Sequence, residues 1–366
     1  MEAATQSHLS AADENAALEQ LHELGCTDGL PVVIPTPERV ARMVLASGYD
    51  AELVLGNMGP GGGVASIEKV AVAAVMAGCT PDYMPIVLAA VRAVLDPRFD
   101  LTEMQATTHC TAPLIIVNGP ARLSCGPIAC GFGALGPGFR ANASIGRALR
   151  LAMLNIGGAK PGVSDMALLG HPGKFTYCLG EDEENSPLPP LHTSRGFGAG
   201  DSTVTVIGAE APHSVIFSGD ADNPESPQAL LDALAIGLAN LATNNAILRG
   251  GSAVVVLNPD HANILVAAGL DRRAIQVSLF ERAAHPLADM MRVAPGLAGR
   301  AKKAGADTTR PAFKAAEDII VLMAGGSGLY SMVMPSWCAG PHQNSAVTIA
   351  IEVDQFCEVP ERNGAG

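Results

Sequence analysis

The sequence predicts an α/β protein whose core is a buried, mostly parallel sheet built from βα units, preceded by a largely helical N-terminal region. Four short β-branched runs carry this prediction, and each ends abruptly in a polar turn rich in Gly or Pro. Helical stretches around 227–243 and 259–268 follow two of them, and apolar strands that alternate with helices are typical of parallel sheets. The four runs are Leu114–Val117, Val204–Ile207, Ala253–Leu257 and Ile319–Met323.

The first hundred residues contain helix signals and no strong strand series. Residues 12–25 place leucines on one helical face, and Thr36 and Ser66 are typical N-caps. The helix after Ser66, IEKVAVAAVMAG, is apolar nearly all round, as buried helices are. We therefore expect a helical region at 1–110 packed on an α/β domain at 111–366, with an irregular insertion at 159–202.

Composition narrows the class of protein. Hydrophobic residues make up 48% and charged residues 16%, which is typical of a globular chain. The formal net charge of −13 disfavours nucleic acid and acidic membrane surfaces as partners. No run reaches the roughly 18 apolar residues of a membrane span, and the polar, acidic first twenty residues lack the pattern of a secretory signal. Eight cysteines in 366 residues do not form a disulfide scaffold, so we expect a cytoplasmic protein.

A glycine-dense loop at Gly131–Gly138 leads into a basic amphipathic helix that ends near residue 158. Backbone N–H groups crowded at a helix N-terminus favour a small anion, with Arg140, Asn142 and Arg147 as its side-chain ligands. The loop also spells GxGxxG, but no strand directly precedes it and Lys160 stands near the place of the expected acid. We expect no nucleotide cofactor. The alternative is a plain turn with solvated arginines.

Two histidines follow predicted strands, each with an acid in the same turn. His213 stands near Glu210, and His261 beside Asp260. Segments 203–214 and 253–263 share strand, polar turn, proline and histidine in that order, so a duplication would bring both histidines to one rim. Imidazole with carboxylate suits proton transfer or a divalent metal, and the metal stays open. The alternatives are structural histidines and an N-cap role for the acid. His109 is a weaker candidate.

Further polar residues could bind substrate near the strand ends. Asn118 begins the turn after the first strand, and the mixed-charge segment 171–195 could fold over the rim as long loops often do. Its alternative is a solvated loop. The candidate ligands there are Lys174, Glu183, His192 and Arg195.

The cysteines allow a different chemistry. Cys125 and Cys130 resemble a redox pair, although their spacing is not that of a CxxC motif, and with His109 and Cys110 they could form a metal site. Structural or incidental thiols are the alternative. GxSxG, HExxH, P-loop and EF-hand motifs do not occur.

Several stretches resemble a family of known proteins. They are GCTDGLPVVIPTPERV, VAVAAVMAGCTPDYMPIVLAAV, GPGFRANASIGRALRL, HPGKFTYC with ENSP, and DSTVTVIGAEAPH, within residues 20–265. They resemble bacterial proteins of unsettled function associated with the UGSC-type (seleno)protein group, sometimes labelled thiol-disulfide proteins. The resemblance implies a bacterial metabolic protein. The chain departs from the family pattern in having two cysteines within 123–133 and Leu329-Tyr330 in place of a Lys-His pair.

These observations predict a cytoplasmic enzyme that acts on a small anionic metabolite by non-redox chemistry, as a hydrolase or a lyase. His213 or His261 would move a proton, with Glu210 or Asp260 orienting the imidazole or sharing a metal. Two alternatives stay open: a thiol redox protein that uses Cys125 and Cys130, and a non-catalytic subunit of a larger enzyme. We expect a homo-oligomer or a partner subunit.

Overall fold

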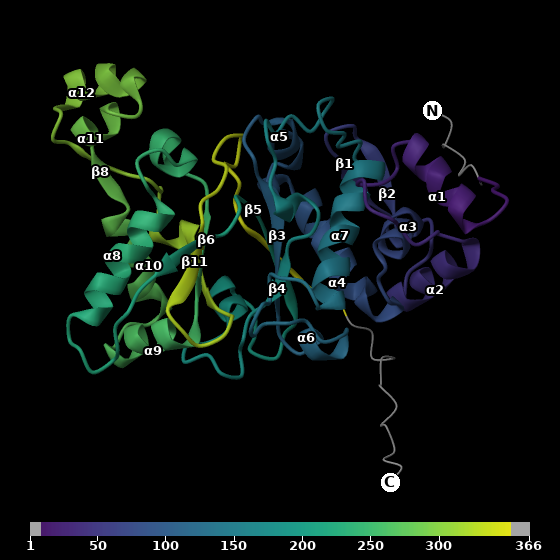
Figure 1. Ribbon diagram of the computed structural model, residues 1–366, viewed down its shortest axis with the longest axis horizontal. Coiled ribbons are helices and arrows are strands. Elements are labelled where there is room, and N and C mark those ends of the chain that lie inside the picture. Colours follow the sequence, from purple (N-terminus) through teal and green to yellow (C-terminus); the bar gives the residue numbers. More distant parts are fainter. Residues whose placement is uncertain (1–8, 353–366) are drawn as a thin grey trace, which may run out of the picture.

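The computed structural model describes residues 9–352 and contains two four-stranded sheets at its centre (Figure 1). The strand order is β12-β5-β3-β4 in the first sheet and β10-β7-β11-β6 in the second. The strands of the first sheet are β3 (Ala112–Asn118), β4 (Cys178–Gly180), β5 (Thr203–Ala209) and β12 (Val347–Ala350). Those of the second are β6 (His213–Ile216), β7 (Ala253–Leu257), β10 (Ile319–Met323) and β11 (Tyr330–Met334).

The two sheets pack face to face. Leu114 and Ile116 of β3 share one apolar cluster with Val254 of β7 and with Ile320 and Leu322 of β10. Side chains alternate along a strand, so the intervening residues of the same strands point outward into two further clusters, each covered by helices. The protein therefore has four layers, helices, sheet, sheet and helices, and Figure 1 shows the strands between the two helical layers.

The helices of the N-terminal region cover the first sheet. α3 and α4 are buried on almost every side, as their all-round apolar sequences predict, and α4 packs on β5 and β12. A hairpin of β1 (Val54–Met58) and β2 (Gly63–Ser66) joins α2 to α3. The helices on this side are α1 (Glu14–Glu23), α2 (Pro37–Ser47), α3 (Ile67–Ala77), α4 (Met84–Leu95), α5 (Leu101–Ala106), α6 (Ala121–Ser124) and α7 (Arg140–Asn155).

Helices of the C-terminal half cover the second sheet, with α10 against β10 and α8 against β6 and β11. A small lobe formed by α11, α12, β8 (Ala284–Pro286) and β9 (Thr309–Pro311) projects at the upper left of Figure 1. The helices on this side are α8 (Ser226–Leu238), α9 (Pro259–Ala267), α10 (Arg272–Arg282), α11 (Leu287–Met291) and α12 (Ala298–Ala304). None of the helices within residues 9–352 is long and apolar enough to cross a membrane.

The prediction of an α/β protein is confirmed in its coarse form, but the prediction of a mostly parallel sheet is wrong. All four predicted strands exist, as β3, β5, β7 and β10. Only β3–β4 and β7–β10 pair in parallel; the other pairs within the two sheets are antiparallel. The segment at 159–202, expected to be irregular, supplies β4 to the first sheet. The short connection 324–329 reverses the chain after β10, so β11 runs antiparallel to β7, which lies between β10 and β11.

The two sheets repeat one topology. Each has a parallel pair, β4–β3 or β10–β7, followed by two antiparallel neighbours. The fourth strands are exchanged, since β6 follows β5 in the chain but joins the second sheet, and β12 follows β11 but joins the first. β7 therefore corresponds to β3 and not to β5. This corrects the predicted repeat of 203–214 with 253–263, and makes Asn258 the counterpart of Asn118.

Candidate functional site

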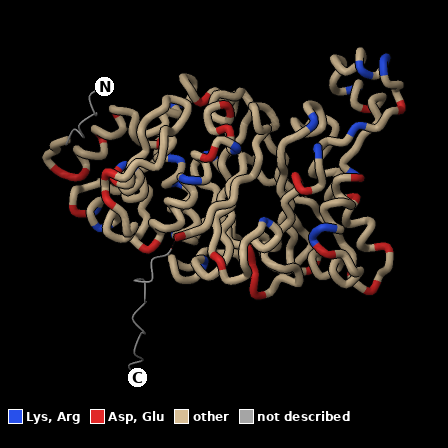
Figure 2. Tube along the Cα trace, turned by 180° about the vertical axis from the view of Figure 1, so that it is seen from behind, with Lys and Arg blue, Asp and Glu red and all other residues tan. Residues whose placement is uncertain are grey.

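Polar side chains gather where β3 and β4 end. The ends of the two sheets meet there, because the backbone N–H of Asp182 donates to Met323 O of β10 (2.9 Å) and that of Gly325 donates to Cys130 O (2.7 Å). The strands themselves are nearly free of charged residues, and most of the charges lie on helices and turns (Figure 2). Ligands of α/β proteins commonly bind beyond the carboxyl ends of strands. We call this group of side chains and its backbone donors the Glu181 cluster; it consists of Asn118, Gly119, Arg122, Glu181, Glu183, Glu184, Leu191, His192 and Arg272.

Glu181 is a completely buried carboxylate directly after β4. Its Oε1 accepts from Arg272 Nη2 (3.0 Å), and its Oε2 accepts from Asn118 Nδ2 (2.5 Å) and from Leu191 N (2.6 Å). Burial raises the pKa of Glu181, while the Arg272 charge and these hydrogen bonds oppose the rise. A buried charge needs such partners to remain ionised in the interior.

Glu183 lies two residues later and is held through one oxygen. Oε1 accepts from Asn118 Nδ2 (2.8 Å) and from Gly119 N (2.7 Å), and Arg122 Nε lies 3.4 Å from it. Gly119 has a φ of +80°, and a Cβ there would lie 2.1 Å from Asp201 O, so only glycine fits the turn that presents its N–H. Within the part of the chain that the structure describes, no hydrogen bond reaches Oε2, which leaves that oxygen for a ligand.

Arg122 and Glu184 form a forked ion pair next to this carboxylate. Arg122 Nη1 and Nη2 donate to the two oxygens of Glu184 at 3.2 and 2.6 Å. The guanidinium is buried, whereas the Glu184 side chain is 55% exposed. The hydrogen bonds from Arg122 lower the pKa of Glu184. Arg122 is therefore fixed in orientation, with its Nε toward Glu183.

His192 completes the cluster. Its side chain has no exposed surface, and Nδ1 lies 3.9 Å from Glu183 Oε1. Neither ring nitrogen has a hydrogen-bond partner within residues 9–352. A buried polar group without a partner is rare in folded proteins and calls for a functional explanation.

The cluster has the parts of a proton-transfer site. A carboxylate with one free oxygen stands beside an imidazole with free nitrogens, and carboxylate and imidazole side chains are common proton-transfer groups in enzymes. In the described part of the chain, the carboxylates of Glu181, Glu183 and Glu184 pair with only two arginines, Arg122 and Arg272. The local field therefore favours a neutral or cationic ligand over an anion.

Of the residues predicted to bind substrate, the structure brings Asn118, Glu183 and His192 into this cluster. It does not bring Arg195, whose guanidinium binds Thr348 Oγ1 and Ala346 O beside β12. Lys174 lies elsewhere too, with Nζ 2.9 Å from Asp165 Oδ1.

The predicted anion ligands on α7 have intramolecular partners. Arg140 donates to Gly78 O, and Arg147 binds the Asp28 carboxylate. The Asn142 side chain is buried. Its Oδ1 accepts a hydrogen bond from Ala129 N, and its Nδ2 donates to the carbonyls of Ala129, Ala134 and Cys178. The three side chains point to separate partners and do not surround one point, so the predicted cradle is not assembled. Asn142 instead braces the glycine loop.

The turns that carry His213 and His261 lie at opposite ends of the sheets. The prediction that both histidines lie at the same end is therefore wrong. β5 runs antiparallel to β3, so Glu210 emerges beside the start of β3. Asp260 follows the end of β7, where its Oδ2 accepts from Gly328 N. His213 is exposed on β6. His261 is buried between Ser331 Oγ (2.7 Å) and Phe217 O (3.3 Å), and burial lowers its pKa, as expected of a structural histidine.

Two other expectations find no geometric support. Within residues 9–352 no three His, Cys, Asp or Glu side chains come together as a metal-ligand set. Cys125 is buried and Cys130 is a free thiol whose pKa burial raises, which disfavours an attacking thiolate at either position. Leu329 and Tyr330 are exposed just before and at the start of β11.

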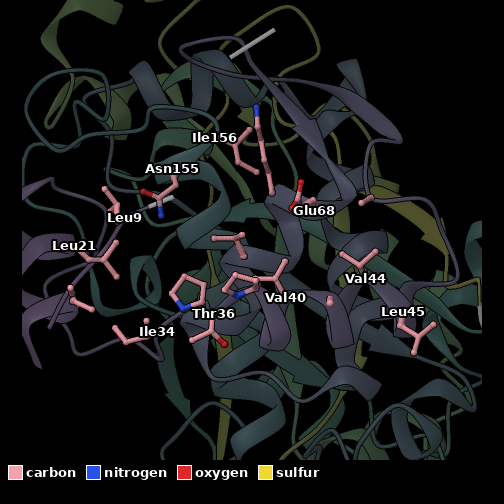
Figure 3. Close-up of a pocket in the computed structure, with 18 of the residues that line it drawn as sticks. Leu9, Leu21, Ile34, Thr36, Val40, Val44, Leu45, Glu68, Asn155 and Ile156 are labelled. Carbon is pink, nitrogen blue, oxygen red and sulfur yellow. The ribbon is translucent and has the colours of Figure 1, made fainter. Parts of the chain in front are cut away.

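The large cavity of the protein lies away from this cluster. A half-open groove of about 1400 Å³ separates α1 from α2, α3 and the end of α7. Figure 3 shows Leu21, Ile34, Val40 and Val44 along it, with Glu68 at its edge. Its lining is mainly apolar and holds no histidine or cysteine, so we do not place the chemistry there.

Comparison with family models, with curated proteins and with solved structures finds no match to this chain. The functional conclusion therefore depends on the site itself.

Proposed function

We propose that this protein is a cytoplasmic enzyme that performs non-redox proton-transfer chemistry, as a hydrolase or a lyase, at the Glu181 cluster. The observation that carries the proposal is the pairing of Glu183 with His192. Glu183 Oε1 lies 3.9 Å from Nδ1 of the fully buried His192 ring, whose nitrogens have no hydrogen-bond partner within residues 9–352, and Glu183 Oε2 is unengaged.

The roles follow from the contacts. Glu183 Oε2 takes the proton from substrate, because donors from Asn118 and Gly119 fix the carboxylate through its other oxygen. His192 donates or accepts a hydrogen bond at the reacting group. Glu181 touches no substrate; it positions Asn118, to which it is bonded at 2.5 Å. Proton transfer by a positioned group contributes about 10²–10⁴-fold to rate.

The substrate that this site favours is a small polar metabolite with an amino or other cationic group. The anionic substrate expected from the sequence depended on Arg140, Asn142 and Arg147, which have protein partners. The excess of acids over bases in the cluster supports the opposite charge.

The test is a turnover screen of small amines, amino acids and amides, followed by NMR, with the wild type and two variants. We expect Glu183→Gln to lose at least about 100-fold in kcat while it still binds substrate. Glu281→Gln is the matched control, since it makes the same change on an exposed acid of α10. Equal turnover by Glu183→Gln and wild type on a genuine substrate would refute the proposal.

A further inference from the structure

A basic cavity lies between the small lobe and the body of the protein. It has a volume of about 520 Å³, and its charged lining comes from three elements: α12 and β9 of the lobe, and the π-helix Asn245–Arg249 that precedes β7. The Glu181 cluster lies at the other end of the second sheet, because Asp182 is bonded to Met323 at the end of β10. The cavity is therefore separate from the proposed active site.

Four basic side chains line this cavity, and none of the lining residues in the described chain is acidic. The four are Arg249, Arg300, Lys303 and Arg310, of which only the last is buried. None of them forms an ion pair within residues 9–352. Figure 2 shows Lys and Arg on the projecting lobe, at the upper right. In a chain with a formal net charge of −13, such a cavity produces a local positive field that favours an anion.

Arg310 is the residue that distinguishes this cavity from a solvated basic surface. Only 9% of Arg310 is exposed, and its Nη1 donates to Ala246 O (2.9 Å) and to Ile247 O (2.7 Å) of the π-helix. In the part of the chain that the structure describes, its Nε and Nη2 make no hydrogen bond and no carboxylate pairs with it. Burial lowers the pKa of Arg310, and the charges of Arg300 and Arg249 lower it further. Buried arginines are almost always paired, so this guanidinium is suited to an anionic ligand.

The spacing of basic residues on α12 directs two of them to the cavity. Arg300 and Lys303 are three residues apart and therefore lie on the same face of the helix. Lys302, which stands between them in the sequence, is not part of the lining. The helix thus presents two of its charges to the cavity and the third elsewhere.

The backbone that carries Arg249 has an unusual conformation. Its φ is +67°, in the left-handed region that residues other than glycine rarely adopt. The π-helix that it ends is fixed by two hydrogen bonds, from Asn245 Nδ2 to Gly250 O (2.7 Å) and from Gly250 N to Ala312 O (2.9 Å). π-helices are rare and frequently occur at functional sites, and strain of this kind persists only where the surrounding structure maintains it.

The composition of the lining indicates the class of anion. Arginine forks and lysines are common partners of phosphate groups. The charges come from three separate elements, and a tetrahedral phosphate presents oxygens in several directions, whereas a carboxylate presents two oxygens in one plane. No aromatic side chain lines the cavity in the described chain, so the lining offers no ring on which a nucleobase could stack. The volume is in the range of small-molecule sites.

We propose that this cavity is a second binding site, which takes a small phosphate compound with several negative charges, such as a diphosphate. Arg310 binds the anion from the buried side, and Arg249, Arg300 and Lys303 bind it from the exposed side. The ligand connects α12 of the lobe to the π-helix of the body, since it contacts basic side chains of both.

The test is calorimetric titration of the full chain with inorganic pyrophosphate, at about 50 mM salt to limit screening and without divalent cations. We expect Arg300→Gln and Lys303→Gln each to weaken binding at least about 10-fold, because each removes a charge-assisted contact. Both residues are exposed, so these variants should fold. Lys302→Gln is the matched control: it removes the same charge from the same helix, outside the cavity, and should weaken binding less than about twofold. Pyrophosphate should also slow backbone hydrogen exchange at 245–249 and 298–304 in the wild type but not in Lys303→Gln.

Three results would overturn the proposal. The first is no binding of pyrophosphate by the wild type. The second is an equal loss of affinity in Lys302→Gln and Lys303→Gln, because binding would then depend on net charge and not on the cavity. The third is citrate binding as tightly as pyrophosphate, which would remove the assignment to phosphate compounds.

Discussion

The buried ion pair between Arg272 and Glu181 offers a quantitative test of how the candidate site is held. Arg272→Met removes a guanidinium that donates to Glu181 and to Val321 O, and leaves a side chain that still fills space. Both partners are buried, with side-chain exposures of 6% and 0%. Removing one member of a buried pair leaves an uncompensated charge and costs about 3–5 kcal/mol. We expect the free energy of unfolding to fall by that amount at neutral pH.

This cost should depend on pH. Burial already raises the pKa of Glu181, and the Arg272 charge is the largest influence against the rise, so the variant raises it further. A carboxyl whose pKa is higher in the folded than in the unfolded state contributes stability that is present below its unfolded pKa, near 4.3, and lost as pH rises through its folded pKa. The penalty of Arg272→Met should therefore shrink as the pH falls from neutral toward the unfolded pKa near 4.3.

The measurement is urea unfolding followed by fluorescence of Trp337, the single tryptophan, which is buried. Arg273→Met is a matched control, because the neighbouring arginine forms an exposed pair with Glu317 whose loss should cost less than about 1 kcal/mol. Adding Glu181→Gln to Arg272→Met removes the buried charge and should recover part of the loss. Equal stability of the two arginine variants, or a penalty that does not change with pH, would show that Glu181 is not held as a buried carboxylate.

Three further substitutions, with Leu18→Ala as a control, test the packing around the site by thermal or urea unfolding. Asn142→Ala removes four hydrogen bonds, two of them buried, to Ala129, the glycine loop and β4, and should lower the free energy of unfolding by about 2–4 kcal/mol. A loss below about 1 kcal/mol would mean that the loop does not need this brace. Gly146→Ala would place a Cβ 2.5 Å from Tyr177 N, so we expect the free energy of unfolding to fall by about 1–3 kcal/mol. An unchanged free energy of unfolding would mean that α7 lies farther from β4 than described. Leu149→Ala, at a buried position, should lower the free energy of unfolding by about 2–5 kcal/mol. Leu18→Ala is the control, because α1 has no buried residue, and it should lower that free energy by less than about 1 kcal/mol. A larger loss in Leu18→Ala than in Leu149→Ala would contradict this packing.

The strands that the sequence predicts correctly are those that are buried along their whole length, apart from the partly buried Pro113 of β3. β7 and β10 are continuous apolar runs and β3 and β5 are nearly so, and such runs are recognisable without knowledge of their neighbours. β4 has only three residues, and β11 alternates between exposed and buried positions after a glycine turn. The prediction of strand direction is wrong because an apolar run carries no information about its partner. The antiparallel pairs β3–β5 and β7–β11 each join segments that are distant in the chain.

For the site, residues in the turns directly after strands could be predicted, and residues that act at long range could not. Asn118 was found because it ends a predicted strand. Glu181 looks like part of a solvated acid run, and only the arrival of Arg272, 91 residues later, makes its burial tolerable. Arg140 and Arg147 resemble anion ligands, yet each has a partner more than 60 residues away that periodicity cannot identify. Basic side chains at a helix start are thus weak evidence for a ligand.

The duplicated topology explains why only one half of the protein carries the proposed chemistry. Asn258 occupies in the second half the place of Asn118, but its side chain caps α9 and bonds backbone carbonyls after β10. The acids that follow β4 have no counterpart after β10, where Ala324 and glycines stand instead. The second half still reaches the site, since Arg272 on α10 neutralises Glu181 and Gly325 bonds Cys130. Neither half alone can therefore hold Glu181 as a buried carboxylate, and the site requires both sheets in their packed arrangement.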